Sequence, residues 1–182
     1  MLQFIIQGRG GQGAQMAGEI LAAAFFTEGK YVQAYATYGG ARRGMPVSSF
    51  VRVDDSPIRL RCDIEHPNYI LCFDQSLLFG NLLKGATEYT TVLINSVGDP
   101  SEFSHLTDSR VVTVDALAIA RAKNLGRIVN SVLVGAFAAL LGAPAKDTLA
   151  DIVAKRSPVK VSENVNACLA GYEWVAKGVN SR

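Results

Sequence analysis

The stretch GRGGQGAQMAGEILAAAFFTEG, residues 8–29, decides the predicted fold. Its first six positions hold four glycines (Gly8, Gly10, Gly11 and Gly13). The segment before them, residues 2–7, is short and mostly apolar, which predicts a buried strand. From 14 to 27 the apolar residues recur at i, i+3 and i+4, which predicts a helix that stops at Gly29. The glycines therefore form a strand-to-helix turn, where the backbone must bend tightly or approach another group closely.

The bulk properties predict one ordinary globular domain over residues 1–182. The chain is 49% hydrophobic and 19% charged, and its net charge of +2 is too small to argue for a nucleic-acid partner. No apolar run approaches the roughly 20 residues that cross a bilayer. The N-terminus lacks the pattern of a secretory signal. We therefore expect a cytoplasmic protein that binds neither nucleic acid nor a membrane.

The cysteines argue against a metal centre on this chain. Cys62, Cys72 and Cys168 stand far apart, and their odd number fits a reducing compartment better than a disulfide framework. An iron–sulfur cluster or a structural zinc site takes about four ligands at close spacings. We expect these cysteines to be small buried hydrophobic residues and the chain to bind no metal.

The remaining pattern predicts a three-layer α/β/α domain. A second strand at 31–37 completes a Rossmann-like first βαβ unit. VSSFVRV (47–53) and IRLRC (58–62) alternate around a turn at 54–57, which predicts an antiparallel hairpin insertion. Strands at 69–73, 91–95 and 111–115 alternate with helical segments, and helices follow at 130–141, 147–156 and 162–178. We expect a mixed, mainly parallel sheet with helices on both faces.

The glycine turn admits more than one interpretation. Gly8, Gly10 and Gly13 fit the G-x-G-x-x-G pattern of dinucleotide-binding sites. That pattern needs an acid at the end of the second strand to hold the ribose, and Ala36, Thr37 and Tyr38 stand there instead. A stand-alone NAD(P)-binding oxidoreductase is therefore an alternative, but the acidic residue that would confirm it is missing. A second alternative is that the glycines serve close packing alone, in a structural subunit.

Three arginines favour an anion site at this turn. Arg9 lies among the glycines, and Arg42 and Arg43 lie in the loop after the second strand. Loops at the carboxyl ends of neighbouring strands flank the binding crevice of open α/β sheets. Surface solubility or an ion pair with another subunit would also explain Arg42 and Arg43. The candidate binding residues are Gly8, Arg9, Gly10, Gly11, Gln12, Gly13, Tyr38, Gly39, Arg42 and Arg43.

The sequence offers no catalytic residue set. It contains neither G-x-S-x-G nor H-E-x-x-H. We interpret His66 and His105 as solvated loop residues, and Asp115 and Asn130 as helix caps. An anion-binding edge without catalytic groups suits a subunit that helps to build a site shared with other chains.

The N-terminal half resembles the gamma subunit of 2-oxoacid:ferredoxin oxidoreductases of the pyruvate synthase type. The resemblance rests on Gly-Gly-Gln-Gly at 10–13, Glu-Gly at 28–29, Tyr-Gly at 38–39 and Arg-Arg-Gly at 42–44. The alternating strands that follow and Asn130 match as well. The resemblance is dense over about residues 4–75 and thinner beyond. At 39–42 this chain reads Gly-Gly-Ala-Arg where the family commonly reads Gly-Pro-Glu-Arg.

The resemblance implies an enzyme of several subunits that is inactive as this chain alone. It would oxidatively decarboxylate a 2-oxoacid with coenzyme A to an acyl-CoA and pass electrons to ferredoxin or flavodoxin. Thiamine diphosphate would lie between alpha and beta subunits, and the iron–sulfur clusters on delta or beta chains. The gamma-type chain would contribute to a shared coenzyme A pocket, with Gly10–Gly13, Arg42 and Arg43 on family motif positions.

Overall fold

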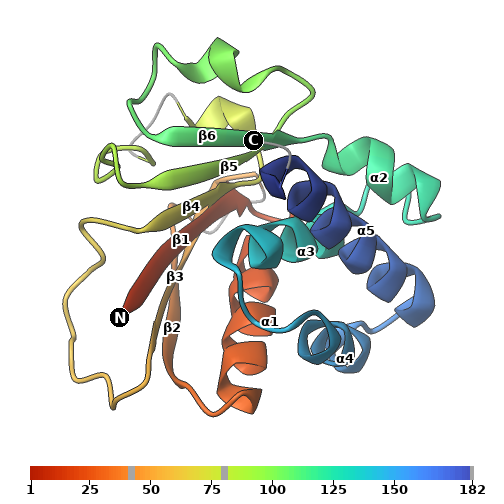
Figure 1. The fold of residues 1–182 in the computed structure, drawn as a ribbon, viewed down its shortest axis with the longest axis horizontal. Helices are drawn as coiled ribbons and strands as arrows, with labels where there is room; N and C mark the ends of the chain where they lie inside the picture. The colour runs from red at the N-terminus through yellow and green to blue at the C-terminus, as the bar shows by residue number, and fades with distance from the viewer. Residues whose placement is uncertain (41–43, 79–81, 181–182) are drawn as a thin grey trace.

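A mixed sheet runs through the molecule. The computed structural model describes residues 1–40, 44–78 and 82–180. In this part of the chain six strands pair in the order β2-β3-β1-β4-β5-β6 (Figure 1). Strands β1, β4, β5 and β6 run parallel, and β3 is antiparallel to both β1 and β2, so the predicted mixed, mainly parallel sheet is confirmed. The strands are β1 (Leu2–Arg9), β2 (Tyr31–Tyr38), β3 (Pro46–Asp54), β4 (Tyr69–Cys72), β5 (Thr91–Asn95) and β6 (Arg110–Val114).

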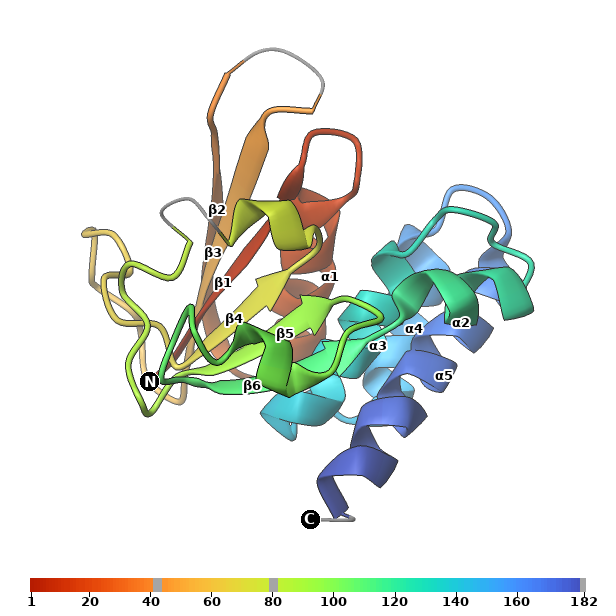
Figure 2. The ribbon, with the colours of Figure 1, turned by 90° about the horizontal axis from the view of Figure 1, so that it is seen from above.

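The α-helices gather on one side of this sheet, as Figures 1 and 2 show together. The opposite face is covered by short 3₁₀ helices, η1 (Gln75–Leu77) and η2 (Pro100–Phe103), whose Leu77 and Phe103 pack on β4 and β5. The predicted third layer is thus built from 3₁₀ turns and irregular chain. The α-helices are α1 (Ala14–Thr27), α2 (Ala116–Ala122), α3 (Asn130–Leu141), α4 (Lys146–Arg156) and α5 (Val161–Asn180).

The main core lies between the helices and the central strand β1. Phe4 of β1 is fully buried, and its ring lies 5.4 Å from that of Phe137 on α3 and 6.4 Å from that of Phe25 on α1. Aromatic pairs at such distances add to the stabilisation that burial of their apolar area provides. This contact packs α1 and α3 side by side on β1. The N-termini of both helices lie at the carboxyl end of β1.

Two details of the strand prediction are wrong. The crossover through α1 does not place β2 beside β1, because β3 pairs with both and lies between them. The hairpin is formed by β2 and β3, and residues 58–62 form no strand. Those residues cross the outer face instead, where Leu60 and Cys62 carbonyls accept hydrogen bonds from Gln33 and Arg52. A dinucleotide site needs its second strand parallel and adjacent to the first, and β3 occupies that place here.

Glycines let α3 and α5 cross at close range. A Cβ added at Gly135 would lie 1.8 Å from the Cys168 carbonyl oxygen, and one at Gly171 would lie 2.1 Å from that of Val132. In both cases the neighbour is backbone, which cannot rotate away as a flexible side chain could. The α3–α5 contact therefore depends on these two residues having no side chain.

We predict that Gly135→Ala lowers the free energy of unfolding by about 1–3 kcal/mol, because the added methyl group overpacks this crossing. Gly178→Ala, also on α5, is the matched control, since a Cβ there meets no atom within 4 Å. The control should be neutral or gain up to about 1 kcal/mol of helix propensity. Urea unfolding of both variants measures this, and equal stabilities would contradict the close crossing.

Candidate functional site

The glycine turn joins the end of β1 to the start of α1, and its glycines serve different purposes. Gly11 and Gly13 adopt φ angles of 97° and 92°, a left-handed conformation that residues with a side chain rarely take. Gly8 lies in a tightly packed place, because a Cβ there would lie 3.1 Å from the Cβ atoms of both Ala14 and Phe73. The packing interpretation therefore holds for Gly8, whereas the other two shape the turn itself.

The N-terminus of α1 carries no capping side chain. Gly13 occupies the N-cap position, and among the described residues no side chain caps the helix and no acid lies in its first turn. The first amide groups of a helix have no partner within the helix and carry a partial positive charge. An uncapped N-terminus at a pocket wall is a place where an anion can bind.

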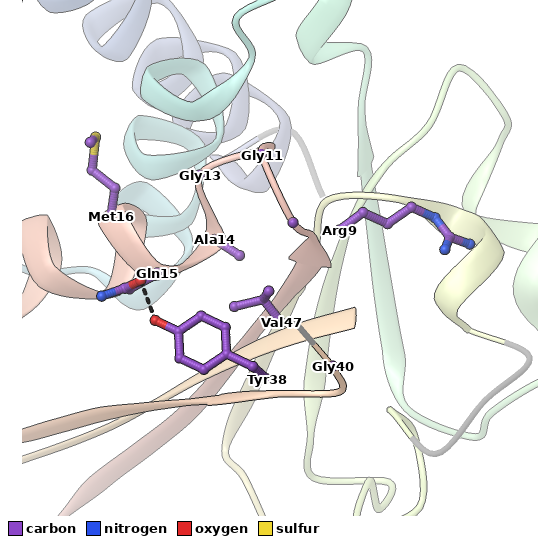
Figure 3. Close-up of a pocket in the computed structure, with 10 residues that line it drawn as sticks. Arg9, Gly11, Gly13, Ala14, Gln15, Met16, Tyr38, Gly40 and Val47 are labelled. Atoms are coloured by element: carbon purple, nitrogen blue, oxygen red, sulfur yellow. Dashed lines mark hydrogen bonds between the residues drawn. The ribbon is translucent and has the colours of Figure 1, made fainter. Parts of the chain in front are cut away.

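The Arg9 side chain is hydrogen-bonded to other parts of the protein. Its Nε donates to Asp74 Oδ2 at 2.9 Å, one Nη donates to the Gly44 carbonyl at 3.1 Å, and the other donates to Ser76 Oγ at 2.7 Å. Figure 3 shows its guanidinium directed away from the pocket. Each guanidinium nitrogen is thus engaged within the protein. The arginine ties the end of β1 to the loop that connects β2 and β3 and to η1.

Gln12 is likewise turned inward. Its Oε1 accepts a hydrogen bond from the Arg9 backbone amide at 2.7 Å, and its Nε2 donates to Asp74 Oδ2 at 3.4 Å. The loop after β2 meets the turn from the other side, where the Gly10 amide donates to the Met45 carbonyl at 2.8 Å. The structure thus brings together the two loops that the sequence singled out. Arg9 and Gln12 hold the turn in shape, and its backbone faces the pocket.

Asp74 accepts hydrogen bonds from the side chains of both Arg9 and Gln12. Burial alone would raise its pKa, but hydrogen bonds from Ser76 and Arg9 outweigh burial, and the net effect is a lowered pKa. Asp74 also caps η1 by accepting from the Ser76 amide. An ionised Asp74 therefore stabilises the folded chain at neutral pH.

An open pocket of about 820 Å³ lies between this turn, α1 and the hairpin (Figure 3). Ala14 and Val47 form an apolar part of its wall, and across it the Tyr38 hydroxyl donates to Gln15 Oε1. Gly39 lies beside the pocket and donates from its amide to the Pro46 carbonyl. Arg42 and Arg43 lie outside the described residues. The lining residues are Arg9, Gly10, Gly11, Gly13, Ala14, Gln15, Met16, Tyr38, Gly40 and Val47.

Asn130 lies against Gly13 of the turn, although the sequence suggested only a helix cap. It is the first residue of α3, whose N-cap is Val129, and no side chain of the described chain caps that helix. Asn130 is 7% exposed, its Oδ1 has no hydrogen-bond partner among the described residues, and its amide nitrogen lies 3.0 Å from a Cβ position at Gly13. A buried side-chain oxygen without a partner costs about 1–3 kcal/mol, which indicates a role beyond packing. Its spacing from the glycines gives no signal in the sequence, because about 120 residues separate them.

Other residues weighed from the sequence lie elsewhere. Asp115 caps α2 by accepting from the Ala118 amide at 2.9 Å, as predicted. Cys72 and Cys168 are buried, as predicted, and burial raises the pKa of each thiol to about 12. The same prediction is wrong for Cys62, which is exposed. His66 and His105 are both exposed. Within the described ranges no three of His, Cys, Asp and Glu gather as metal ligands, and no helix is long and apolar enough to cross a membrane.

Comparison with known proteins identifies the family. The family model described as pyruvate ferredoxin/flavodoxin oxidoreductase matches residues 3–174. The chain belongs to this family. Membership confirms the resemblance inferred from the glycine turn and the motifs that follow it.

The chain is similar to individual members over most of its length. Pyruvate synthase subunit PorC of Methanothermobacter thermautotrophicus is 41% identical over 180 residues, 97% of both chains. The crystal structure of pyruvate oxidoreductase subunit PORC from Thermotoga maritima superposes with a TM-score of 0.84 at 30% identity, covering 94% of this chain and 95% of that one. The fold, at 20% identity and a TM-score of 0.79, also recurs in 2-oxoglutarate:ferredoxin oxidoreductase from Magnetococcus marinus, solved with 2-oxoglutarate, coenzyme A and succinyl-CoA bound. That likeness covers 97% of this chain and 31% of the other.

We predict that Asp74→Asn lowers the free energy of unfolding by about 1 kcal/mol at pH 7. Because the pKa of Asp74 is lowered by folding, its stabilising effect is present above about pH 4 and is lost as the pH falls through the folded-state pKa. The difference from the parent chain should therefore shrink between about pH 5 and 3, as measured by urea unfolding at each pH. Asp151→Asn, an exposed residue of α4, is the matched control. A difference that stays constant over this pH range would contradict the role given to Asp74.

Proposed function

We propose that this chain, as the gamma subunit of a multisubunit 2-oxoacid:ferredoxin oxidoreductase, forms part of the coenzyme A site and supplies no catalytic residue. The complex would oxidatively decarboxylate pyruvate or a related 2-oxoacid with coenzyme A to acyl-CoA and carbon dioxide. Ferredoxin or flavodoxin would accept the electrons. Alpha, beta and delta subunits would hold the thiamine diphosphate and the iron–sulfur clusters, and the complex would work in the cytoplasm.

The uncapped N-terminus of α1 carries this proposal. It presents backbone amides at a pocket beside a turn held rigid by Arg9, Gln12 and Asp74. Coenzyme A brings phosphate groups, and backbone amides at a helix N-terminus are suited to bind them. The relative from Magnetococcus marinus, whose fold recurs here, binds coenzyme A, which supports the choice of ligand.

Residues around the turn complete the proposed site. Asn130 would accept a hydrogen bond from an N–H or O–H group of coenzyme A at its Oδ1, the side-chain oxygen that has no partner among the described residues. Tyr38, 59% exposed, and Met16, 42% exposed, offer aromatic and thioether surface at the pocket for the adenine ring. Arg42 and Arg43 would pair with phosphate groups through their guanidinium forks. The proposed binding set is therefore Gly10, Gly11, Gly13, Tyr38, Gly39, Arg42 and Arg43 from the sequence, with Asn130 added. Gly8, Arg9 and Gln12 support it.

We predict that Asn130→Ala in the purified complex raises the KM for coenzyme A about tenfold, because a ligand N–H or O–H group left without its acceptor in the site costs about 1–3 kcal/mol. The kcat and the KM for the 2-oxoacid should stay unchanged. The thermal midpoint of the chain should not fall, because the Asn130 Oδ1 has no hydrogen bond in the described protein to lose. A lowered midpoint with an unchanged KM would make Asn130 a structural residue.

A second test addresses the arginines of the hairpin loop. Arg42→Ala together with Arg43→Ala should raise the KM for coenzyme A by about tenfold or more, and by less at high salt, because salt screens exposed charges. Arg59→Ala with Arg61→Ala removes the same charge from exposed positions of the segment after β3 and should leave the KM unchanged. If neither double variant changes the KM for coenzyme A, the alternative that this subunit has a purely structural role gains support.

A further inference from the structure

Charge is unevenly distributed along the chain. Residues 1–109 contain eight lysines and arginines and eleven acidic residues. Residues 110–182 contain ten lysines and arginines and five acidic residues. The helical C-terminal part is therefore basic although the net charge of the whole chain is only +2. Surface charge of one sign is an argument about partners and association rather than about the fold.

Much of this positive charge gathers at two loops that contact each other. The loop between α2 and α3 and the loop between α4 and α5 lie side by side in Figure 2, and Lys160 Nζ donates to the Asn124 carbonyl at 2.8 Å. The Asn164 side chain fixes the second loop by donating to the Lys160 carbonyl at 2.9 Å, and it accepts from Ser131 of α3. Asn124 and Lys160 both adopt positive φ angles, 62° and 51°. These hydrogen bonds hold the two loops in one arrangement.

We call this surface the basic platform. All of its cations are exposed, and none forms a salt bridge with a described residue. Two acids lie near these cations: Glu163 is near Lys160, and Glu173, which also interacts electrostatically with Lys123, is paired with Lys146. The cations of the platform are Arg121, Lys123, Arg127, Arg156 and Lys160.

Exposed aliphatic side chains lie among these cations. Ile128 is 47% exposed, Val159 63% and Val161 44%. Single exposed aliphatic residues are ordinary, but three of them in two touching loops and at the adjoining start of α5 favour contact with another protein. Arginine is enriched in protein interfaces, and three of the five platform cations are arginines. A phosphate ligand would need the cations and not the aliphatic residues.

We propose that the basic platform docks a carboxylate-rich surface of another subunit of the same oxidoreductase. The inference rests on the proposed function, which places this chain in a complex. Positive side chains held on fixed loops repel one another, and a surface of opposite charge relieves that repulsion while covering the aliphatic residues. Asn130 directly follows the α2–α3 loop, so the docked subunit would lie next to the proposed coenzyme A site.

Lysine footprinting of the purified complex tests the docking. Acetylation of Lys123 and Lys160 should be at least about fivefold slower in the complex than in the same chain released by high salt, because a docked partner excludes the reagent. The reaction at Lys84, exposed on the opposite face of the sheet, is the reference for general reagent access. A zero-length carbodiimide reagent should link Lys123 or Lys160 to an aspartate or glutamate of another subunit.

Charge reversal gives an independent measurement. In Arg127→Glu with Arg156→Glu, the salt concentration that releases half of this chain from the complex should fall at least about twofold, since like charges would then face each other. Arg59→Glu with Arg61→Glu makes the same change in net charge elsewhere and should leave it unaltered. If the double variant does not fold, the footprint of the parent complex still decides.

The outcomes separate the two proposals. A chain that assembles with Lys123 and Lys160 as reactive as in the released chain overturns the docking and leaves the proposed function intact. Equal dissociation of the two charge-reversal pairs overturns the docking as well. A chain that purifies with no other subunit contradicts the proposed function, and the docking falls with it.

Discussion

The contact between Arg9 and Asp74 is the constraint on which the proposed site depends. The guanidinium joins the end of β1 to the loop that connects β2 and β3 and to η1, so it fixes three segments that meet at one end of the strands. Gln12 shares the same carboxylate and closes the turn from within. Because these polar side chains are engaged inside the protein, the backbone of the turn is what faces the pocket. The site is therefore made mainly of amide groups held in place from behind.

This arrangement suits a subunit without catalytic residues of its own. The turn lies between α1 and α3, whose N-termini meet at Gly13 and Asn130, and among the described residues neither helix has a capping side chain. The close crossing of α3 and α5 at Gly135 and Gly171 holds α3 in this position. An anionic ligand would accept hydrogen bonds from the first amide groups of these helices. Such a chain contributes binding geometry, and the reactive cofactors belong to other subunits in our proposal.

Much of the fold could be predicted from periodicity. The strand–glycine–helix unit at residues 2–27 and the parallel strands from 69 onward follow directly from the spacing of their apolar residues. The order of the strands could not, because pairing is a long-range choice. The local sequence pattern does not indicate that β3, and not β2, pairs with β1. The alternation in residues 58–62 is misleading, since Leu60 is exposed and that segment follows the outer face through carbonyl contacts with Gln33 and Arg52.

The site could be predicted only in part, for the same reason. The glycines and the loop after β2 meet as expected, but Arg9 is held by Asp74, 65 residues away along the chain. Asn130 resembles a cap because asparagine is common there, and only the structure shows its unpartnered side-chain oxygen and its place beside Gly13.

The most direct test of the proposed site is a structure of the assembled complex with coenzyme A bound. We expect phosphate oxygens about 2.7–3.2 Å from the first amide nitrogens of α1. Coenzyme A bound with every phosphate outside hydrogen-bond distance of that helix would contradict the proposal.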